Sequence, residues 1–365
     1  MFFHLIPSLH PCGNTAQLRV RARSLGRDGT ESHIFTFQPV LPEVRQSFEG
    51  IAQIHELNVH FALEPFWRIM LTARKLHLKP REVQVWGTEL LAPGLHLAQY
   101  YNYNVCSSAV LRHQDAFGRR LPILRLFSRV EANSTALRDA AIEAGNRGNW
   151  QVIHDVLEAP SETGPKTTSK TRVEFLEEVG APEDALLVAC VGPISTWKRW
   201  QWAIWSIDSI VRVHPKMRLL LFDPDLENLP ARRLNPLVER ERHNVADFIS
   251  QYERESIVRF LPFRKDFREI LPFFNVLWIP QTTPGSGLTA LEAAAVGVPI
   301  VAHRAALDSE LFPDGKFTAL PEFPETISLA SATHNLWKSI GIFPEWRPNS
   351  SAQTVPPRAD ERQNS

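Results

Sequence analysis

A glycine-rich turn and a carboxylate lie close together within residues 275–310, NVLWIPQTTPGSGLTALEAAAVGVPIVAHRAALDSE. Gly285, Ser286 and Gly287 precede an apolar stretch with helical spacing, and the free N–H groups at the start of such a helix favour an anion. Glu292 follows about one and a half turns into this helix. Its two carboxylate oxygens could accept hydrogen bonds from an adjacent pair of sugar hydroxyls.

The elements around this turn predict how it is positioned. Residues 276–279 form a short apolar run of strand type, residues 288–296 a helix, and residues 299–302 a second buried strand. A strand, a helix and a strand in this order predict a right-handed β-α-β unit. Ligands of such units bind at the carboxyl ends of the strands, where the turn lies.

The sequence PGSGLTALEAAAVGVPIVA, with the Glu310 that follows, resembles the donor-site signature of the retaining, GT-B-fold glycosyltransferases of family 4. That signature has two glutamates eight positions apart around a Gly-x-Gly-Leu turn. Glu292 occupies the second position, and Pro284 stands at the first. The resemblance implies that Glu292 binds the ribose of a nucleotide sugar; the alternative is a carboxylate that is exposed to water or paired with a cation. The donor-site residues that it implies in this stretch are Gly285, Ser286, Gly287, Leu288 and Glu292.

A second stretch, VGPISTWKR at residues 191–199, resembles the family's Gly-Arg-Leu-x3-Lys-Gly, whose arginine and lysine hold the donor diphosphate. Lys198 falls on the lysine, Pro193 replaces the arginine, and Arg199 stands where glycine is usual. Arg199 is therefore a candidate to supply the missing guanidinium. The alternative for Lys198 is a solvated surface cation, although a cation in the first turn of a helix opposes the helix dipole by some tenths of a kcal/mol.

In the N-terminal half, Val-Trp-Gly-Thr-Glu at residues 85–89 resembles a family strand end with His-Gly-Thr-Asp. Trp86 replaces the histidine; an indole could stack on a sugar or fill the cleft, but it cannot accept a proton. The sequence therefore assigns no catalytic residue. The remaining candidates are His60, Glu64, Trp86 and Glu89 for catalysis, Gly13 and Asn14 in an acceptor-side loop, and Leu261 and Phe263 at a pocket for the nucleotide base.

Strand-like and helical stretches alternate along the chain, which predicts an α/β protein with parallel sheets covered on both faces. With the resemblance, this implies two doubly wound Rossmann-like domains facing a cleft, the GT-B architecture. We predict an N-terminal acceptor-side domain at residues 1–159, a linker at 160–172, a C-terminal donor domain at 173–343 and a disordered tail at 344–365. Predicted strands lie at residues 2–6, 33–37, 58–62, 83–86, 105–108, 129–132, 152–153, 186–191, 219–222, 257–260, 276–279 and 299–302, and predicted helices include 15–25, 44–57, 173–179 and 198–213, with a turn at 11–14.

The composition indicates which classes of partner and which cellular compartment to expect. Lysine plus arginine equals aspartate plus glutamate at 40 each, so the overall charge does not favour nucleic acid. Three widely spaced cysteines indicate buried thiols, with neither a disulfide framework nor a zinc site. We expect a cytoplasmic protein, because no apolar run is long enough to span a membrane and the first seven residues lack the pattern of a signal peptide.

The helix at residues 198–213 has an apolar stripe of core type, made of Trp200, Ala203, Ile204, Ile207, Ile210 and Val211. Trp202 and Trp205 lie off this stripe, toward Ser206, Ser209 and Arg212. They indicate an interface with the other domain, a partner protein or the inner face of a membrane, unless they are scattered exposed aromatics. The arginines at positions 19, 21, 23 and 27 could contact anionic lipid, although a solvated face also accounts for them.

The resemblance implies an enzyme that transfers a hexose, with retention of configuration, from a nucleotide diphosphate sugar to a glycan or a lipid-linked acceptor. The resemblance implies that this enzyme needs neither a metal ion nor another cofactor. The alternative is a non-catalytic relative that binds a nucleotide, a sugar or a partner protein, because three family positions differ at Trp86, Pro193 and Pro284. A GT-B epimerase or phosphorylase is disfavoured, since no such signature is present. The donor base, the sugar, the acceptor and the oligomeric state do not follow from the sequence.

Overall fold

The computed structural model describes residues 1–10, 12–57, 64–101, 105–112, 121–157, 170–192, 198–223, 236–251, 254–262, 264, 266–285, 287–315, 318–321 and 328–341. Three candidate residues, His60, Phe263 and Ser286, lie outside these ranges, as does Pro193. The predicted strand at 58–62, most of the predicted linker and the predicted tail also lie outside them. The chain divides into two compact units. Unit 1 comprises Met1–Ser161 and Thr283–Leu288, and unit 2 comprises Glu162–Thr282 and Thr289–Ser365.

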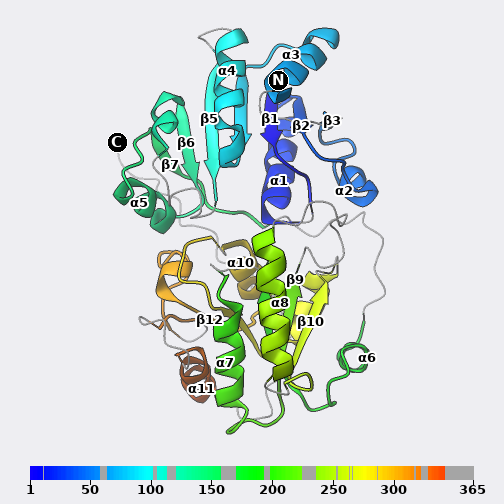
Figure 1. Cartoon of the computed structure of the whole chain (residues 1–365), viewed down its shortest axis with the longest axis vertical. Coiled ribbons are helices and arrows are strands. Elements are labelled where there is room, and N and C mark those ends of the chain that lie inside the picture. Colours follow the sequence, from blue (N-terminus) through cyan, green and yellow to red (C-terminus); the bar gives the residue numbers. More distant parts are fainter. Residues whose placement is uncertain are drawn as a thin grey trace, which may run out of the picture. The chain divides into compact units, whose positions relative to one another are not determined.

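Unit 1 contains a seven-stranded parallel sheet with the strand order β3-β2-β1-β4-β5-β6-β7 (Figure 1). The order reverses between β1 and β4, as in a doubly wound sheet. Its strands are β1 (Phe2–Ile6), β2 (Ser32–Thr36), β3 (Gln53–Glu56), β4 (Glu82–Trp86), β5 (Cys106–Leu111), β6 (Arg129–Ala132) and β7 (Trp150–Val152), and its helices are α1 (Gly13–Arg27), α2 (Pro42–Ser47), α3 (Glu64–Lys75), α4 (Leu91–Tyr101) and α5 (Thr135–Glu143).

Both faces of this sheet are covered, because successive strand residues point to opposite sides. Phe3, Leu5 and Val85 belong to one apolar cluster, which includes side chains of α3, α4 and α5. Ile6 and Trp86 belong to a smaller cluster, which includes side chains of α1 and α2. The unit is therefore a three-layer α/β domain.

Unit 2 contains a six-stranded parallel sheet with the order β10-β9-β8-β11-β12-β13. The order reverses between β8 and β11, so this sheet is doubly wound as well. Its strands are β8 (Leu186–Val191), β9 (Met217–Asp223), β10 (Val258–Pro262), β11 (Val276–Ile279), β12 (Ile300–Ala302) and β13 (Thr318–Ala319), and its helices are α6 (Arg172–Glu178), α7 (Trp200–Ile210), α8 (Pro236–Gln251), α9 (Phe267–Ile270), α10 (Gly287–Ala295) and α11 (Ser328–Ile340).

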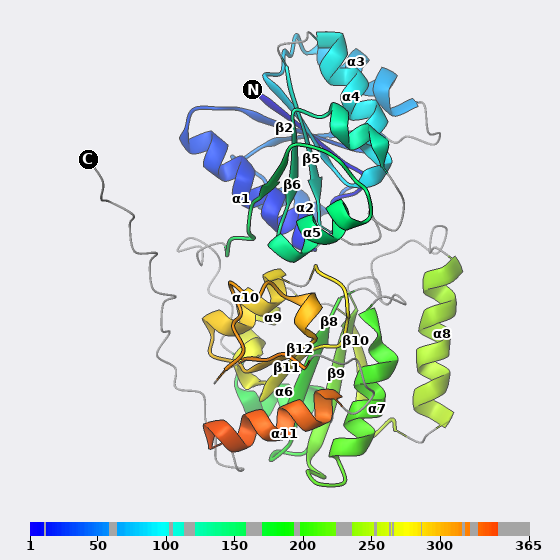
Figure 2. The ribbon, with the colours of Figure 1, turned by 90° about the vertical axis from the view of Figure 1, so that its left-hand side faces the viewer.

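Two apolar clusters, one on each face of the sheet, hold unit 2 together. Leu187 and Ala189 of β8 belong to the cluster that includes α6, α9 and α10. Val188 and Cys190 of the same strand belong to the other cluster, which includes α7, α8 and α11. On that side α11 packs against α7 (Figure 2).

Most predicted elements are present, and four strands have the predicted bounds: β1, β6, β8 and β11. The predicted helix at residues 44–57 is wrong, because α2 ends at Ser47 and β3 begins at Gln53. The N–H groups of Ile51 and Ala52 bond back to the Phe48 carbonyl, which closes the turn before β3 pairs with β2. The predicted turn at 11–14 is also wrong in part, since Gly13 and Asn14 begin α1.

Two further expectations need correction. Cys12 is exposed, whereas Cys190 is buried and Cys106 is partly buried, so the three cysteines are not all buried thiols. Ser206 is fully buried, although the sequence placed it on the side of α7 away from the core. Within the described ranges, no helix is long and apolar enough to span a membrane.

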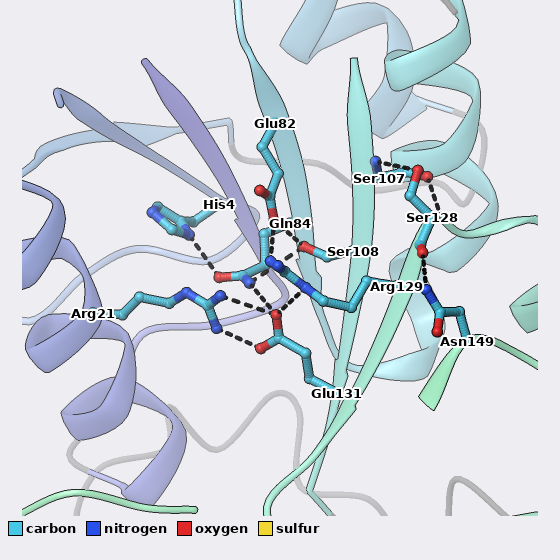
Figure 3. Close-up of polar contacts among 10 residues, drawn as sticks. All are labelled: His4, Arg21, Glu82, Gln84, Ser107, Ser108, Ser128, Arg129, Glu131 and Asn149. Atoms are coloured by element: carbon cyan, nitrogen blue, oxygen red, sulfur yellow. Dashed lines mark hydrogen bonds and ion pairs between the residues drawn. The ribbon is translucent and has the colours of Figure 1, made fainter. Parts of the chain in front are cut away.

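One face of the unit 1 sheet contains a buried charge network (Figure 3). Glu131 on β6 is almost fully buried and accepts hydrogen bonds from both terminal nitrogens of Arg21 on α1, one at 2.9 Å. Its Oε1 also lies 2.7 Å from Nε of Arg129. Arg129 then donates to Oε1 of Glu82 at 2.7 Å, and the hydroxyl of Ser108 donates to the same oxygen at 2.6 Å.

Gln84 extends this network across the middle of the sheet (Figure 3). Its amide nitrogen donates to Ser108 at 3.3 Å, and its amide oxygen lies 3.1 Å from Nδ1 of His4. Burial, and then the charge of Arg21, lower the pKa of His4 to about 3, so its ring is neutral. The polar residues alternate along β4 and β6, which places them on one face of the sheet.

A histidine pair predicts acid sensitivity in unit 1. His33 Nδ1 lies 3.0 Å from His55 Nε2, and burial, followed by the charge of His33, lowers the pKa of His55 to about 4. A lowered histidine pKa stabilises the fold above the unfolded pKa of about 6.5, so we expect stability to fall as the pH drops from there toward 4. Urea unfolding across this pH range should show a smaller loss of stability for His55→Phe than for the wild type. His96→Gln, at an exposed site on α4, should keep the wild-type loss; equal losses in all three proteins would contradict the prediction.

Candidate functional site

The carboxyl end of β8 in unit 2 holds a buried lysine against a glycine. Gly192 directly follows the strand and has a φ of 134°, a backbone conformation that residues with a side chain rarely adopt. A Cβ atom built on Gly192 would lie 2.7 Å from Cε and 3.0 Å from Nζ of Lys198. The lysine side chain therefore folds back over the glycine, and a larger residue at 192 would displace it.

Lys198 is only 7% exposed, so it is not a solvated surface cation. It also precedes α7, which begins at Trp200, so the predicted position in the first helical turn is wrong. Burial lowers the pKa of Lys198 to about 7, while Cys190 acts in the opposite direction. An anion placed against the ammonium group would raise this pKa and favour the charged form.

Arg199 follows Lys198 and adopts the left-handed conformation, with φ 52° and ψ 43°. Its Nε donates a hydrogen bond to the Thr282 hydroxyl at 3.1 Å, three residues past the end of β11. Its guanidinium carbon lies 4.3 Å from the ring centroid of Trp202. Arg199 is therefore held at the carboxyl edge of the sheet, between the neighbouring strands β8 and β11.

The glycine-rich turn follows β11, as predicted. Gly285 has a φ of 140°, which favours glycine at this position. Gly287 and Leu288 are the first residues of α10. Pro284 is buried and cannot supply the carboxylate that the resemblance places there.

Glu292 on α10 forms an ion pair with Arg268 on α9. Arg268 Nε donates to Glu292 Oε1 at 2.8 Å, and the glutamate side chain is 14% exposed. Burial raises the pKa of Glu292, and the hydrogen bond from Arg268 offsets part of that rise. The structure thus has the cation-paired arrangement that the sequence left as an alternative. Among the described residues Oε2 accepts no hydrogen bond, so one oxygen can still accept from a ligand.

Two other strand ends line the same edge of unit 2. Leu261, the base-pocket candidate, is partly buried near the end of β10. Asp223 ends β9, is fully buried and accepts a hydrogen bond from Arg242 of α8 at 2.9 Å. Sequence reasoning missed this pair, although an aspartate directly after the apolar run at 219–222 was a usable signal.

The candidate residues of unit 1 lie on several different elements. Trp86 is 3% exposed and packs in the core cluster with Ile6 and Val110, so its ring fills the interior. Glu89 is exposed, with Oε2 2.9 Å from the position of a Cβ built on Gly87. The backbone of Glu64 begins α3. Gly13 and Asn14 begin α1, at the carboxyl end of β1.

A polar group at the carboxyl ends of β5, β6 and β7 was also missed. Arg112 directly follows β5 and pairs with Asp155, which is almost fully buried. Asn133 directly follows β6 and donates to the same carboxylate oxygen at 3.4 Å. Their positions just past three neighbouring parallel strands are the signal that could have identified them.

The two tryptophans off the core stripe of α7 have different surroundings. Trp202 lies under the guanidinium of Arg199. Trp205 is 37% exposed and contacts Phe248 of α8 edge-on, with 5.6 Å between ring centroids. Trp202 thus contributes to the candidate site rather than to an open surface.

Comparison with known proteins gives a family match in the C-terminal half of the chain. Residues 185–339 match the family model described as glycosyl transferases group 1. This segment includes Lys198, Arg199, the glycine-rich turn and Glu292. No curated protein matches the sequence significantly.

Solved structures similar to this chain include glycosyltransferases. The crystal structure of Anabaena HepE in complex with UDP and glucose has a TM-score of 0.69 and 18% identity, over 92% of this chain and 89% of that chain. Sucrose-phosphate synthase from Thermosynechococcus elongatus has a TM-score of 0.68 and 15% identity, over 93% and 90%. A glycosyltransferase from Rickettsia africae has a TM-score of 0.68 and 13% identity, over 93% and 88%. These likenesses confirm the predicted fold class, two Rossmann-like domains of the GT-B type.

Proposed function

We propose that this protein is a glycosyltransferase that moves a hexose from a nucleotide diphosphate sugar to a glycan or a lipid-linked acceptor, with retention of configuration. The observation that carries the proposal is Lys198, which is buried against Gly192 at the carboxyl end of β8. It lies in the segment that matches the glycosyltransferase family model. A buried ammonium group at this edge of a doubly wound sheet is suited to bind an anionic ligand.

In this proposal Lys198 stabilises the negative charge of the leaving group. A nucleoside diphosphate gains negative charge as the bond to the sugar breaks, and a fixed cation stabilises that charge more strongly in a buried site than in water. The pKa of about 7 means that the lysine is partly neutral at pH 7 before the donor binds. The diphosphate then favours its protonated form. In this proposal cationic side chains, rather than a metal ion, neutralise the leaving group.

Other residues that follow β11 in the sequence fit the remainder of a nucleotide sugar. Oε2 of Glu292 is the oxygen available for a ribose hydroxyl, because Oε1 is engaged by Arg268. Gly285 and Gly287 allow close approach of the backbone at the start of α10. A lipid-linked acceptor would require contact with the surface of a membrane, whereas a glycan acceptor would not. We assign no catalytic acid or base.

A specific observation favours a second candidate, a non-catalytic protein that binds a nucleotide sugar or a related ligand. Trp86, at the position of the family's histidine, is buried in the core of unit 1. Pro284 replaces a donor-site carboxylate, and Glu292 is paired with Arg268. Acceptor-dependent formation of a glycosylated product would exclude this candidate.

Thermal unfolding with UDP, GDP, ADP and their sugar conjugates tests the proposal. A ligand that binds only the native protein adds about 2.7 kcal/mol at a hundredfold excess over Kd, so we expect a clear rise in the midpoint with one of these nucleotides. Lys198→Ala should give a smaller rise. Lys216→Ala, at an exposed surface ion pair with Asp184, should preserve the wild-type rise. If no nucleotide raises the wild-type midpoint at millimolar concentration, the proposed donor site is wrong.

A further inference from the structure

Arg199 has a backbone conformation that is unfavourable for an arginine. Among the non-glycine residues that the structure describes, only Arg199 and His77 have a positive φ. The left-handed conformation places Cβ close to the following carbonyl oxygen, a strain that glycine avoids. Interactions of the arginine side chain, which glycine would lack, must offset this strain.

The guanidinium of Arg199 is held in place before any ligand binds. Nε donates to the Thr282 hydroxyl at 3.1 Å, and one face of the planar group stacks on Trp202. Neither contact is a hydrogen bond from Nη1 or Nη2. Within the described ranges of unit 2 these two nitrogens donate no hydrogen bond. Their paired N–H groups match the geometry of a phosphate.

Arg199 and Lys198 lie at the same edge of the unit 2 sheet. The lysine is its neighbour in sequence, and it folds over Gly192 at the end of β8. Thr282, which orients the guanidinium, lies in the loop after β11, the strand next to β8. A partly buried guanidinium and a buried ammonium group therefore share one edge of the sheet, and an anionic ligand would stabilise both charges.

We propose that Arg199 binds the diphosphate of the nucleotide donor, through Nη1 and Nη2, in place of the guanidinium that Pro193 cannot supply. This inference rests on the proposed function. Thr282 and Trp202 are positioning residues for Arg199, because they fix its guanidinium in advance and so reduce the loss of side-chain freedom on binding.

The variant Arg199→Gly separates binding from folding. Glycine adopts the left-handed conformation readily, so the free variant should unfold at about the wild-type temperature. Its affinity for the nucleoside diphosphate that binds the wild type should fall by about 10- to 100-fold, as expected for the loss of one charge-assisted, bidentate contact. Trp202→Leu and Thr282→Val should each give a smaller loss. Arg212→Ala, a charge-matched change at an exposed site just after α7, should bind normally.

Isothermal titration calorimetry with UDP, GDP and ADP, combined with thermal unfolding of the free proteins, distinguishes the outcomes. Weaker binding by Arg199→Gly with an unchanged unfolding temperature supports the inference. Wild-type affinity in this variant overturns the inference but leaves the proposed function standing. A markedly lower unfolding temperature of the free variant would mean that Arg199 stabilises the fold, and this result also overturns the inference. If the wild type binds none of the three diphosphates, the proposed function and the inference fail together.

Discussion

Lys198→Ala is expected to lower the rate of sugar transfer by about 100- to 1,000-fold, the effect of removing one preorganised group that stabilises charge in a transition state. The lysine is buried against Gly192, where its ammonium group is held in place before the donor binds. Single-turnover measurements with saturating donor should show the loss in the transfer step itself. Lys216→Ala removes an exposed lysine of the same unit and should transfer at the wild-type rate.

The pH dependence of donor binding gives a second measurement on the same variant. Because the pKa of Lys198 is about 7 in the free protein, the neutral form predominates above that pH and binding must take up a proton. Donor affinity should therefore fall as the pH rises above 7, by up to about tenfold per pH unit. Lys198→Ala should lack this dependence. A variant with wild-type transfer and the wild-type pH profile would rule out the assigned role.

Glu131→Ala is expected to destabilise unit 1 by about 3 kcal/mol. Breaking a buried ion pair on one side costs about 3–5 kcal/mol, and the lower end applies because Arg21 and Arg129 are 23% and 25% exposed and can be partly hydrated. The substitution also leaves the amide of Gln84 with one fewer acceptor. Hydrogen exchange of the amides in β4, β5 and β6 measures this loss within unit 1 itself.

Asp139→Ala is the matched control for this experiment. Asp139 pairs with Arg138 on the surface of α5 and is 58% exposed, so its removal should change stability by about 1 kcal/mol or less. If Glu131→Ala had an effect as small as that of Asp139→Ala, the network in Figure 3 would contribute little to stability. Its polar residues would then require another explanation.

Local patterns predicted the architecture well. Apolar runs bounded by turns predicted β8 and β11 with their observed bounds, because parallel strands buried on both faces require nearly continuous apolar sequence. The strand-like stretches at β1 and β6 were also predicted with their observed bounds, although β6 contains Arg129 and Glu131. The helix predicted at 44–57 failed because Ile51, Ile54 and Leu57 fit a helical spacing, while pairing of β3 with β2 decided the strand. Tertiary pairing overrides a local pattern where the pattern is short.

The site was predicted as a set of positions but not as an arrangement. The resemblance to the family's motifs identified Lys198, the glycine-rich turn and Glu292 as candidates. The sequence left open whether Lys198 is solvated and whether Glu292 is paired with a cation. It also predicted a core stripe on α7 that includes Trp200, Ile204 and Ile207, all of which are buried.

The sequence by itself determined two doubly wound sheets and the strand ends at which a ligand would bind, because both depend on the order of residues along the chain. The tertiary structure alone decided that Lys198 folds over Gly192, that Arg199 is held by Thr282 and Trp202, and that Arg268 pairs with Glu292. Burial and charge pairing depend on which residues from distant parts of the chain become neighbours. Motif spacing carries no information on that, so the electrostatics of the site follow only from the fold.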